Sequence, residues 1–465
     1  MTIPAQPLRI VHAIHDYLPR HCAGSEIYVG ELCRELARRH HVTVFCAEYD
    51  PSRPHGQITW RVHDGIPVAE VVNNWVGTTF KDTYRPALLT RRLAELLDVV
   101  QPDVLHIHNL LNLSFDFPIE ARRRGIATVA TLHDYTLVCP SGGQRLHRSA
   151  GHVCHDIDVR RCAACFPESP FGARVSVRPI ANAAARSTLI QGAVDVARRR
   201  LPAIARRAAT LAQAVSSPTF PPQDYADRLT EARRVFEDVD MWVAPSASLA
   251  EEFHRLGMPA DRMEVADYGF APLSSRPRTT AERLRIGFVG TLVWHKGVHV
   301  LLEAARHLPR GTFELRIHGA QTTFPEYLAT LRALGDGLPV SFEGPFAPDQ
   351  AGDVYSGLDV LVVPSLWLEN SPLVIHEAFL AGIPVVGANI GGISDLVSDG
   401  VNGFLYEPSS PHELARCLTR LITDRDQLRA LVHRHPPVKG IDADARDWEA
   451  RYRAVVSRYA PAPSA

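Results

Sequence analysis

Lysine is almost absent from this chain. Lysine and arginine together number 50, yet lysine occurs only at Lys81, Lys296 and Lys439, so arginine carries nearly all of the positive charge. The net charge is −1, which argues against a nucleic-acid-binding protein. No apolar run approaches the roughly 18–20 residues that a membrane-spanning helix needs. The absence of both features indicates an ordinary globular protein with neither a nucleic-acid partner nor a membrane span.

The amino terminus lacks the basic and apolar segments of a signal peptide, and a strand-like run begins at residue 8. We therefore expect a cytoplasmic protein. In that compartment the eight cysteines are expected to be free thiols or metal ligands and not disulfides. Walker A, H-E-x-x-H and G-x-S-x-G motifs are absent, as is the complete G-x-G-x-x-G fingerprint of an NAD site.

Strand-like and helix-like segments alternate along the whole chain, which predicts an α/β fold with parallel, doubly wound sheets. The alternation restarts near residue 284, after a stretch rich in proline, serine and arginine, so a length of 465 residues divides into two similar domains. The expected strands are residues 8–14, 42–46, 66–72, 103–108, 128–134, 240–246, 284–292, 313–319, 340–344, 359–365 and 384–389.

The segment from Glu369 to Gly382 lies between two of these strands. Ser371 is expected to cap a helix, Pro372 to occupy its first position, and Gly382 to end it. The free N–H groups of such a helix start attract an anion, usually phosphate. Glu369 and Glu377 add two carboxylates, which suit hydroxyl groups. A nucleotide sugar offers both phosphates and hydroxyls.

Glu369, seven intervening residues and Glu377, followed by Ala-Gly-Ile-Pro-Val-Val, resemble the E-x7-E signature of retaining family-4 glycosyltransferases. The resemblance implies a GT-B fold, in which two Rossmann-like domains face an interdomain cleft. The implied division is an acceptor-side domain 1–270 with a cysteine-rich loop 139–165 and an arginine-rich insertion 174–215, a linker 271–282, a nucleotide-sugar domain 283–440, and a segment 441–465 whose helix returns to the first domain.

The same resemblance implies roles for particular residues. Glu377 would accept hydrogen bonds from the ribose, Glu369 would contact the donor sugar, and Lys296 would contact the diphosphate. His133 resembles the family histidine that contacts the donor sugar, and Thr291 stands where the family often has arginine. The expected catalytic residues are thus Glu369, His133 and Lys296, and the expected donor-binding residues are Glu377, Gly24, Thr291, Asn370, Ser371, Leu373 and Val374.

The expected reaction moves a sugar from a UDP- or GDP-sugar to a hydroxyl of a glycan, a lipid-linked acceptor or a small molecule, with retention at the anomeric carbon. Because Lys296 and the helix start supply positive charge, no divalent cation is expected in catalysis. Two alternatives stay open: a phosphorylase or sugar-nucleotide epimerase with the same two-domain shape, and a non-catalytic binding subunit.

Four of the eight cysteines lie close together in the sequence. The spacing of Cys139, Cys154, Cys162 and Cys165 ends in C-x2-C and fits a structural zinc site, although it is not that of a standard zinc finger. Reduced, buried thiols are the alternative. The neighbouring histidines that could replace a cysteine as ligand are His147, His152 and His155.

Eight arginines and a single acid lie in the segment Arg174–Arg207. Apolar residues between them indicate a basic amphipathic helix, which could lie on anionic lipid at the inner face of the membrane. The alternative is a solvated helix in a chain that uses arginine in place of lysine.

Overall fold

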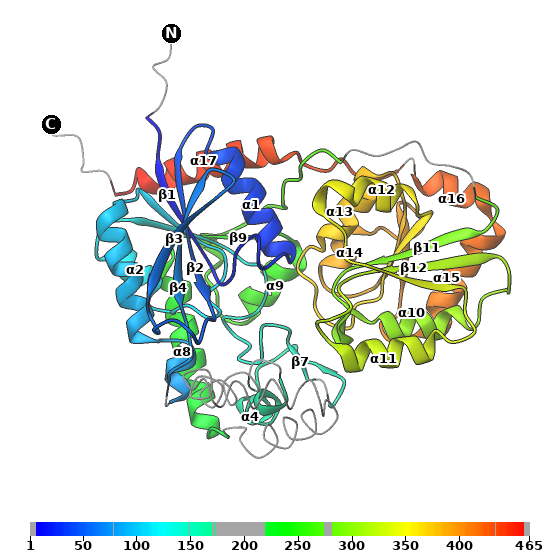
Figure 1. Cartoon of the computed structure of the whole chain (residues 1–465), viewed down its shortest axis with the longest axis horizontal. Helices are drawn as coiled ribbons and strands as arrows, with labels where there is room; N and C mark the ends of the chain where they lie inside the picture. Colours follow the sequence, from blue (N-terminus) through cyan, green and yellow to red (C-terminus); the bar gives the residue numbers. More distant parts are fainter. Residues whose placement is uncertain are drawn as a thin grey trace, which may run out of the picture.

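The protein is described here by a computed structural model that covers residues 6–169 except 78 and 148, residue 172, residues 219–273, and residues 281–459 except 433. Figure 1 shows two lobes side by side, the first in blue to green and the second in yellow to orange. The segment Arg174–Arg207 falls outside the described residues, so its contact with a membrane stays a prediction.

The first lobe is built on a sheet whose described strands number eight, in the order β10-β9-β6-β5-β1-β2-β4-β3. The pairings are parallel except that of β3 with β4, and β3 had not been expected from the sequence. The strands are β1 (Arg9–Ile14), β2 (His41–Glu48), β3 (Ile58–His63), β4 (Ile66–Val72), β5 (Val104–Ile107), β6 (Ala127–Thr131), β9 (Met241–Ala244) and β10 (Met263–Val265).

Helices cover both faces of this sheet because each carries one apolar stripe. In α2, for example, Leu89, Leu93, Leu96 and Leu97 recur at three- and four-residue spacing and are all buried. The helices of the first lobe are α1 (Gly24–Leu36), α2 (Ala87–Val100), α3 (Phe117–Arg122), α8 (Pro222–Asp238) and α9 (Ala247–Arg255), with the 3-10 turns η1 (Phe80–Thr83) and η2 (Ala260–Arg262).

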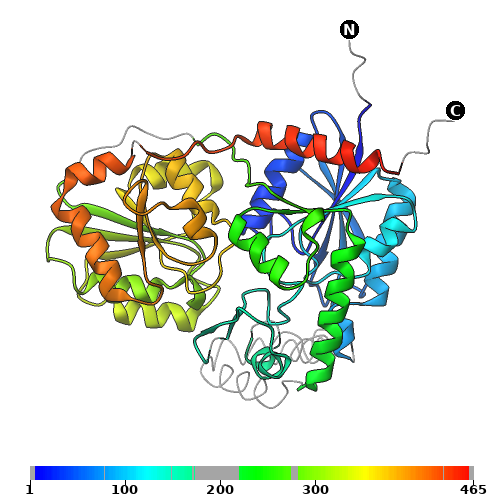
Figure 2. The same ribbon diagram turned by 180° about the vertical axis from the view of Figure 1, so that it is seen from behind.

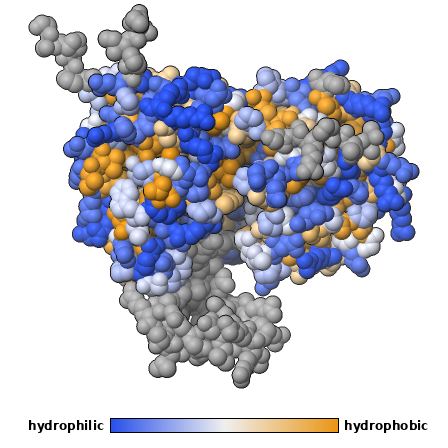
Figure 3. Space-filling model, turned by 45° about the horizontal axis from the view of Figure 1, so that its top comes forward, coloured by the Kyte–Doolittle hydropathy of each residue, from blue (hydrophilic) through white to orange (hydrophobic). Residues whose placement is uncertain are grey.

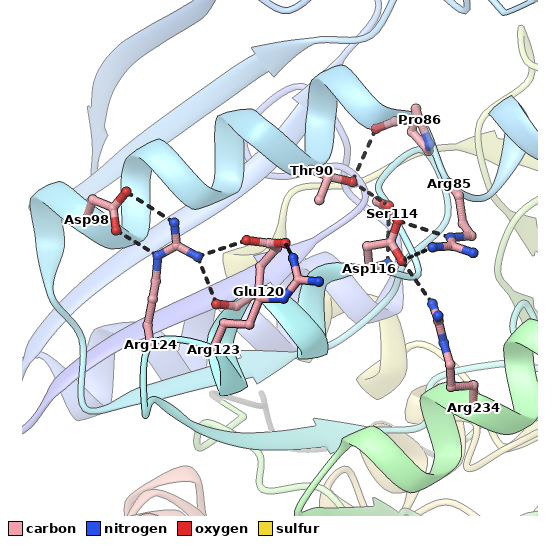
Figure 4. Close-up of polar contacts among 10 residues, drawn as sticks. All are labelled: Arg85, Pro86, Thr90, Asp98, Ser114, Asp116, Glu120, Arg123, Arg124 and Arg234. Atoms are coloured by element: carbon pink, nitrogen blue, oxygen red, sulfur yellow. Dashed lines mark hydrogen bonds and ion pairs between the residues drawn. The ribbon is translucent and has the colours of Figure 1, made fainter.

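Ion pairs between arginines and acids join the exposed sides of these helices. Figure 4 shows Arg124 against Asp98 of α2 and Glu120 of α3, and Asp116 between Arg85 and Arg234. Asp98 is exposed and the other side chains are half-buried, and ion pairs this close to solvent contribute only about 0–1 kcal/mol each. They show how arginine takes the place of lysine on this surface.

The second lobe has six described strands in one parallel sheet, in the order β13-β12-β11-β14-β15-β16. They are β11 (Leu284–Val289), β12 (Phe313–His318), β13 (Val340–Gly344), β14 (Val360–Val363), β15 (Val385–Ala388) and β16 (Gly403–Tyr406). The flanking helices are α10 (Val298–Ala305), α11 (Pro325–Leu334), α12 (Ala351–Ser356), α13 (Leu373–Leu380), α14 (Gly392–Leu396), α15 (Pro411–Thr423) and α16 (Arg425–Val432), with η3 (Trp294–Lys296) and η4 (Pro348–Gln350).

Helix α17 (Ile441–Val456) returns to the first lobe, as Figures 1 and 2 show in red along the top of the molecule. Its Trp448 and Tyr452 are buried in the same apolar cluster as Tyr28 of α1. The Tyr28 hydroxyl donates to Asp444 at 2.8 Å and accepts from the Trp448 indole at 2.9 Å. The last helix therefore ties the two lobes together.

A small module lies below the first lobe in Figure 1, where α4 and β7 are labelled. It consists of the hairpin β7 (Leu146–His147) and β8 (His152–Val153), followed by α4 (Val159–Glu168). On the face seen in Figure 3, hydrophilic residues cover most of both lobes and apolar residues gather at their junction. No helix within the described residues is long and apolar enough to cross a membrane.

Candidate functional site

Lys296 and Glu369 meet at the carboxyl edge of the second sheet. Lys296 ends η3, which follows β11, and Glu369 lies in the loop after β14. Strands β11 and β14 are neighbours, so the two loops lie side by side where parallel sheets bind ligands. The Lys296 ammonium is 2.7 Å from Glu369 Oε1 and 5.1 Å from the centre of the Trp367 ring.

The carboxylate of Glu369 is held firmly. It is 2% exposed, and its Oε1 also accepts a hydrogen bond of 2.5 Å from the Ser365 hydroxyl. Both bonds go to the same oxygen, so Oε2 makes no hydrogen bond to the described residues. The site therefore combines a fixed carboxylate with one free oxygen and a partly exposed cation.

Close backbone packing shapes these loops. Gly297 has φ +70°, and a Cβ atom there would lie 1.8 Å from the carbonyl oxygen of Pro364. A Cβ atom on Gly392 would lie 1.7 Å from the carbonyl oxygen of Asn370. Only glycine fits at either position. Gly391 and Gly392 are adjacent after β15, and such a glycine pair is a signal in the sequence for a close backbone approach.

Helix α13 begins at Leu373, and its N-cap is Pro372. The expectations that Ser371 caps this helix and that Pro372 occupies its first position are therefore both wrong. The Ser371 hydroxyl instead lies 2.8 Å from Asp267 and 3.0 Å from Nε2 of His376. Asp267 follows β10, whereas His376 lies on α13 itself, and no side chain caps this helix. The N–H groups of Leu373 and Val374 therefore keep their capacity for an anion.

Glu377 lies on α13 and is partly buried. The Tyr355 hydroxyl donates to its carboxylate at 2.5 Å, and burial raises the pKa of Glu377 above its ordinary value. Burial raises the pKa of Glu31 of α1, and the nearby negative charge of Glu377 raises it further. Tyr355 and Glu31 are thus neighbours of the site that no sequence motif indicated.

The first lobe faces this site through the start of α1. A Cβ atom on Gly24 would lie 3.2 Å from the side chain of Leu373, so the starts of α1 and α13 are close together. The carboxylate of Glu26 accepts from the N–H of Ala23 at 3.1 Å and lies 3.2 Å from Nε2 of His15. Glu26 therefore stabilises the start of α1.

The side-chain amide of Asn370 donates hydrogen bonds to the first lobe across the junction of the two lobes. Its Nδ2 lies 2.6 Å from the carbonyl oxygen of His133 and 3.3 Å from the Tyr268 hydroxyl. Tyr268 in turn is 2.9 Å from Nδ1 of His133, and Nε2 of His133 is 3.1 Å from Nδ1 of His108. Nε2 of His108 is 2.9 Å from Nδ1 of His12. One hydrogen-bonded chain therefore runs from the second lobe into the core of the first.

His106 lies beside this chain but serves the fold. Its Nδ1 is 2.7 Å from the Tyr452 hydroxyl and its Nε2 is 2.8 Å from the Thr131 hydroxyl, so both ring nitrogens have partners. Burial lowers the pKa of His106 well below its ordinary value. This agrees with the structural role expected for His106.

The structure brings most of the expected residues to one place. Glu369, Asn370, Ser371, Leu373 and Val374 form one continuous loop and helix start, with Lys296 bonded to it. Thr291 follows the end of β11 and is exposed. Its contact with a phosphate stays a prediction.

The position of His133 is harder to reconcile with its expected role. The side chain is 7% exposed, and both ring nitrogens already bond protein groups. A hydrogen bond to a donor sugar would require one of them to leave its partner. The role of His133 in positioning the sugar therefore stays a prediction.

Two family models match the sequence. Residues 23–198 match "Glycosyltransferase Family 4" and residues 283–424 match "Glycosyl transferases group 1". The second match contains Lys296, Glu369 and Glu377, and the first contains Gly24 and His133.

Curated relatives match over part of their length. A D-inositol 3-phosphate glycosyltransferase of Corynebacterium urealyticum is 33% identical over 188 residues, which are 38% of this chain and 43% of that protein. The sulfoquinovosyl transferase SQD2 of Arabidopsis thaliana is 28% identical over 203 residues, 40% of this chain and 38% of that protein. The similarity thus spans less than half of either relative.

Solved structures match over nearly the whole chain. Sucrose-phosphate synthase from Thermosynechococcus elongatus has a TM-score of 0.66 at 17% identity and covers 98% of this chain and 100% of that one. Anabaena Alr3699/HepE in complex with UDP and glucose has a TM-score of 0.60 at 17% identity, covering 97% and 98%. These likenesses confirm the GT-B fold. The chain belongs to the glycosyltransferases, with a family-4 domain in its first half and a group-1 domain in its second.

Proposed function

We propose that this protein transfers a glycosyl group from a nucleotide sugar to a hydroxyl acceptor, with retention of the anomeric configuration. The observation that carries the proposal is the contact of 2.7 Å between Lys296 and Glu369 at the open start of α13. A cation, free N–H groups and a carboxylate meet there at the junction of the two lobes. This combination suits a sugar attached to a diphosphate.

Charge is the main contribution of Lys296 and the helix start. Cleavage of the bond between sugar and diphosphate leaves negative charge on the departing oxygen, and donors fixed in advance stabilise that charge. Lys296 and the N–H groups of Leu373 and Val374 are placed for this task. Because these groups belong to the protein, the proposal needs no divalent cation in catalysis.

The carboxylates are assigned to hydroxyl groups of the donor. Glu369 has one free oxygen and would accept from the sugar, whereas Glu377 would accept from the ribose. Tyr355 orients Glu377 through the hydrogen bond of 2.5 Å and is therefore a positioning residue. Gly24 lets the start of α1 approach Leu373 closely, and the donor would lie beside this contact.

The donor is proposed to be a UDP- or GDP-sugar, and the acceptor a glycan, a lipid-linked molecule or a small molecule. A related fold that binds UDP and glucose, as in the Anabaena protein, supports a uridine nucleotide as the first to test. A cytoplasmic location and a membrane-bound acceptor belong to the same proposal.

The test measures nucleoside diphosphate released from a panel of UDP- and GDP-sugars, with and without a mixture of hydroxyl acceptors. We expect release to depend on the acceptor. The Lys296→Ala variant should lose about 100-fold or more in rate, as for removal of one donor to a developing anion. Lys81→Ala is the matched control, because Lys81 is exposed and lies in η1, far along the chain from the site.

The other outcomes select the alternatives. Sugar 1-phosphate formed from a glycan and phosphate would show a phosphorylase. Conversion of one sugar nucleotide into another without an acceptor would show an epimerase. If the wild type and Lys296→Ala bind the donor equally well and neither transfers sugar to any acceptor, the protein is a binding subunit.

A further inference from the structure

The four cysteines of the module below the first lobe converge on one pocket. Cys139 lies in the loop between β6 and β7, and Cys154 follows β8. Cys162 and Cys165 lie one turn apart on α4. All four line the same pocket and none forms a disulfide.

A buried cation beside these thiols has no carboxylate partner. Arg228 of α8 is 5% exposed, and its guanidinium donates to the carbonyl oxygens of Leu137 and Thr136. No carboxylate pairs with it in the described part of the chain. The guanidinium lies over the rings of Phe115 and Tyr84, 5.0 and 5.8 Å from their centres, and it lines a small pocket together with Cys139. A buried positive charge is costly unless an anion is nearby, and Cys139 as a thiolate would supply one.

Arg145 lines the pocket of the four cysteines itself, together with Arg161, Asp156 and Asp158. Arg145 is 2% exposed, and one of its nitrogens pairs with Glu252. Its Nε and Nη2 are buried and have no hydrogen-bond partner among the described residues. Two unsatisfied donors on a buried cation point to an anionic group that should lie within their reach.

Helix α4 of the module packs on the first lobe through Phe166, which is buried in the apolar cluster of that lobe, but the hairpin is short. The strands of its hairpin are two residues each, too short to be stable alone. Nevertheless Leu146 of this hairpin is buried in the apolar cluster of the second lobe, which also contains Trp367 beside Lys296. The module therefore contacts both lobes, the first through α4 and the second through its short hairpin.

We propose that Cys139, Cys154, Cys162 and Cys165 together bind one zinc ion, which fixes this hairpin against the second lobe. Four thiols lose four protons and give a site of net charge −2, which Arg145 and Arg228 face. Four thiolates select zinc over the harder divalent cations. No three of the sulfur atoms lie within 4.8 Å of one another here. The edges of a zinc–sulfur tetrahedron measure about 3.8 Å, so binding draws the thiols inward.

The histidines of the module are not needed as ligands. His147 Nδ1 accepts from the N–H of Ala150 at 3.3 Å, and His152 Nε2 is 2.7 Å from Arg161. His155 is exposed. The proposal therefore assigns the site to sulfur alone.

The first experiment measures metal content of the full chain by mass spectrometry after purification without chelators. We expect about one zinc per chain, lost in Cys162→Ser and in Cys154→Ser. Cys22→Ser, at an exposed cysteine, and Cys417→Ser, at a buried one, are the controls and should keep the metal. A wild type without zinc, iron in its place, or full zinc in both ligand variants would overturn the proposal.

A second experiment uses the folded wild type, so that a misfolded variant cannot confuse the result. A mercurial reagent is titrated into the protein, and a chelating dye reports the zinc released. We expect release to follow the reaction of four thiols, and replacement by cobalt to give thiolate-to-cobalt charge-transfer absorption. No release, or cobalt spectra without that absorption, would contradict a four-sulfur site. Neither readout depends on glycosyl transfer.

Discussion

The side-chain amide of Asn370 donates to the carbonyl oxygen of His133 over 2.6 Å, across the junction of the two lobes. The second hydrogen of this amide is directed at the Tyr268 hydroxyl, 3.3 Å away. Tyr268 therefore accepts from Asn370 and donates its own hydrogen to His133. The same order continues inward, so that His133 donates to His108 and His108 donates to His12. A residue next to Glu369 thus sets the tautomers of three buried histidines.

Removing this amide should loosen the junction. Asn370→Asp keeps the shape but replaces two donors by a carboxylate that faces a carbonyl oxygen. Hydrogen exchange, followed by mass spectrometry, should become faster by about 10-fold or more in the segments around His133 and Tyr268. Asn389→Asp, at an exposed residue of the second lobe, is the control. Unchanged exchange in Asn370→Asp would mean that the contact does not hold the lobes together.

The buried histidines should make the protein sensitive to acid. Burial lowers the pKa of His12 and of His133 to about 3, whereas an unfolded histidine has a pKa near 6.5. The fold favours the neutral rings, so their contribution to stability is complete above about pH 6.5. It is lost as the pH falls from there toward 3, by up to about 1.4 kcal/mol per pH unit for each histidine.

Denaturation by urea between pH 7.5 and pH 5 checks this dependence. His12→Gln keeps an acceptor and a donor but does not titrate, so its free energy of unfolding should fall less steeply with acid than that of the wild type. His307→Gln, at an exposed histidine, should leave the wild-type slope unchanged. Equal slopes in the wild type and in His12→Gln would show that His12 is not kept neutral by the fold.

Glu377 should act on the ribose and not on the diphosphate. Calorimetry would compare the nucleoside diphosphate that the wild type binds with its 2′,3′-dideoxy analogue. Loss of hydrogen bonds to a charged group should weaken wild-type binding about 10- to 100-fold. In Glu377→Gln the two ligands should differ much less, while Glu326→Gln, at an exposed residue of α11, should keep the full difference. A full difference in Glu377→Gln would assign the ribose to another residue.

Gly297 should tolerate no side chain because of the carbonyl of Pro364. Gly311 is the matched control, since it has φ +78° against +70° for Gly297 but no atom within 4 Å of the added Cβ. Gly311→Ala should lower the free energy of unfolding by about 1 kcal/mol, the cost of the backbone conformation alone. Gly297→Ala should cost about 1–3 kcal/mol more. Similar midpoints in chemical denaturation for the two variants would contradict the clash.

Much of the fold could be predicted from local patterns. The expected strand at 340–344 matches β13, and Gly382 follows the end of α13 with φ +67°. The sequence pattern did not predict strand β3. Strand β3 is exposed at two of its first three residues and pairs antiparallel at an edge, so it lacked the buried run that marked the other strands.

Sequence alone determined that the residues from Glu369 to Gly382 form a loop and a helix start between two strands, because these elements follow from short-range periodicity and backbone preferences. Only the tertiary structure decided what those residues touch. Asn370 and His133 are 237 residues apart in the chain, and Ser371 bonds Asp267, 104 residues away, instead of capping α13. Such contacts depend on how two separately folded sheets meet, and the order of residues along one strand or helix does not encode that meeting.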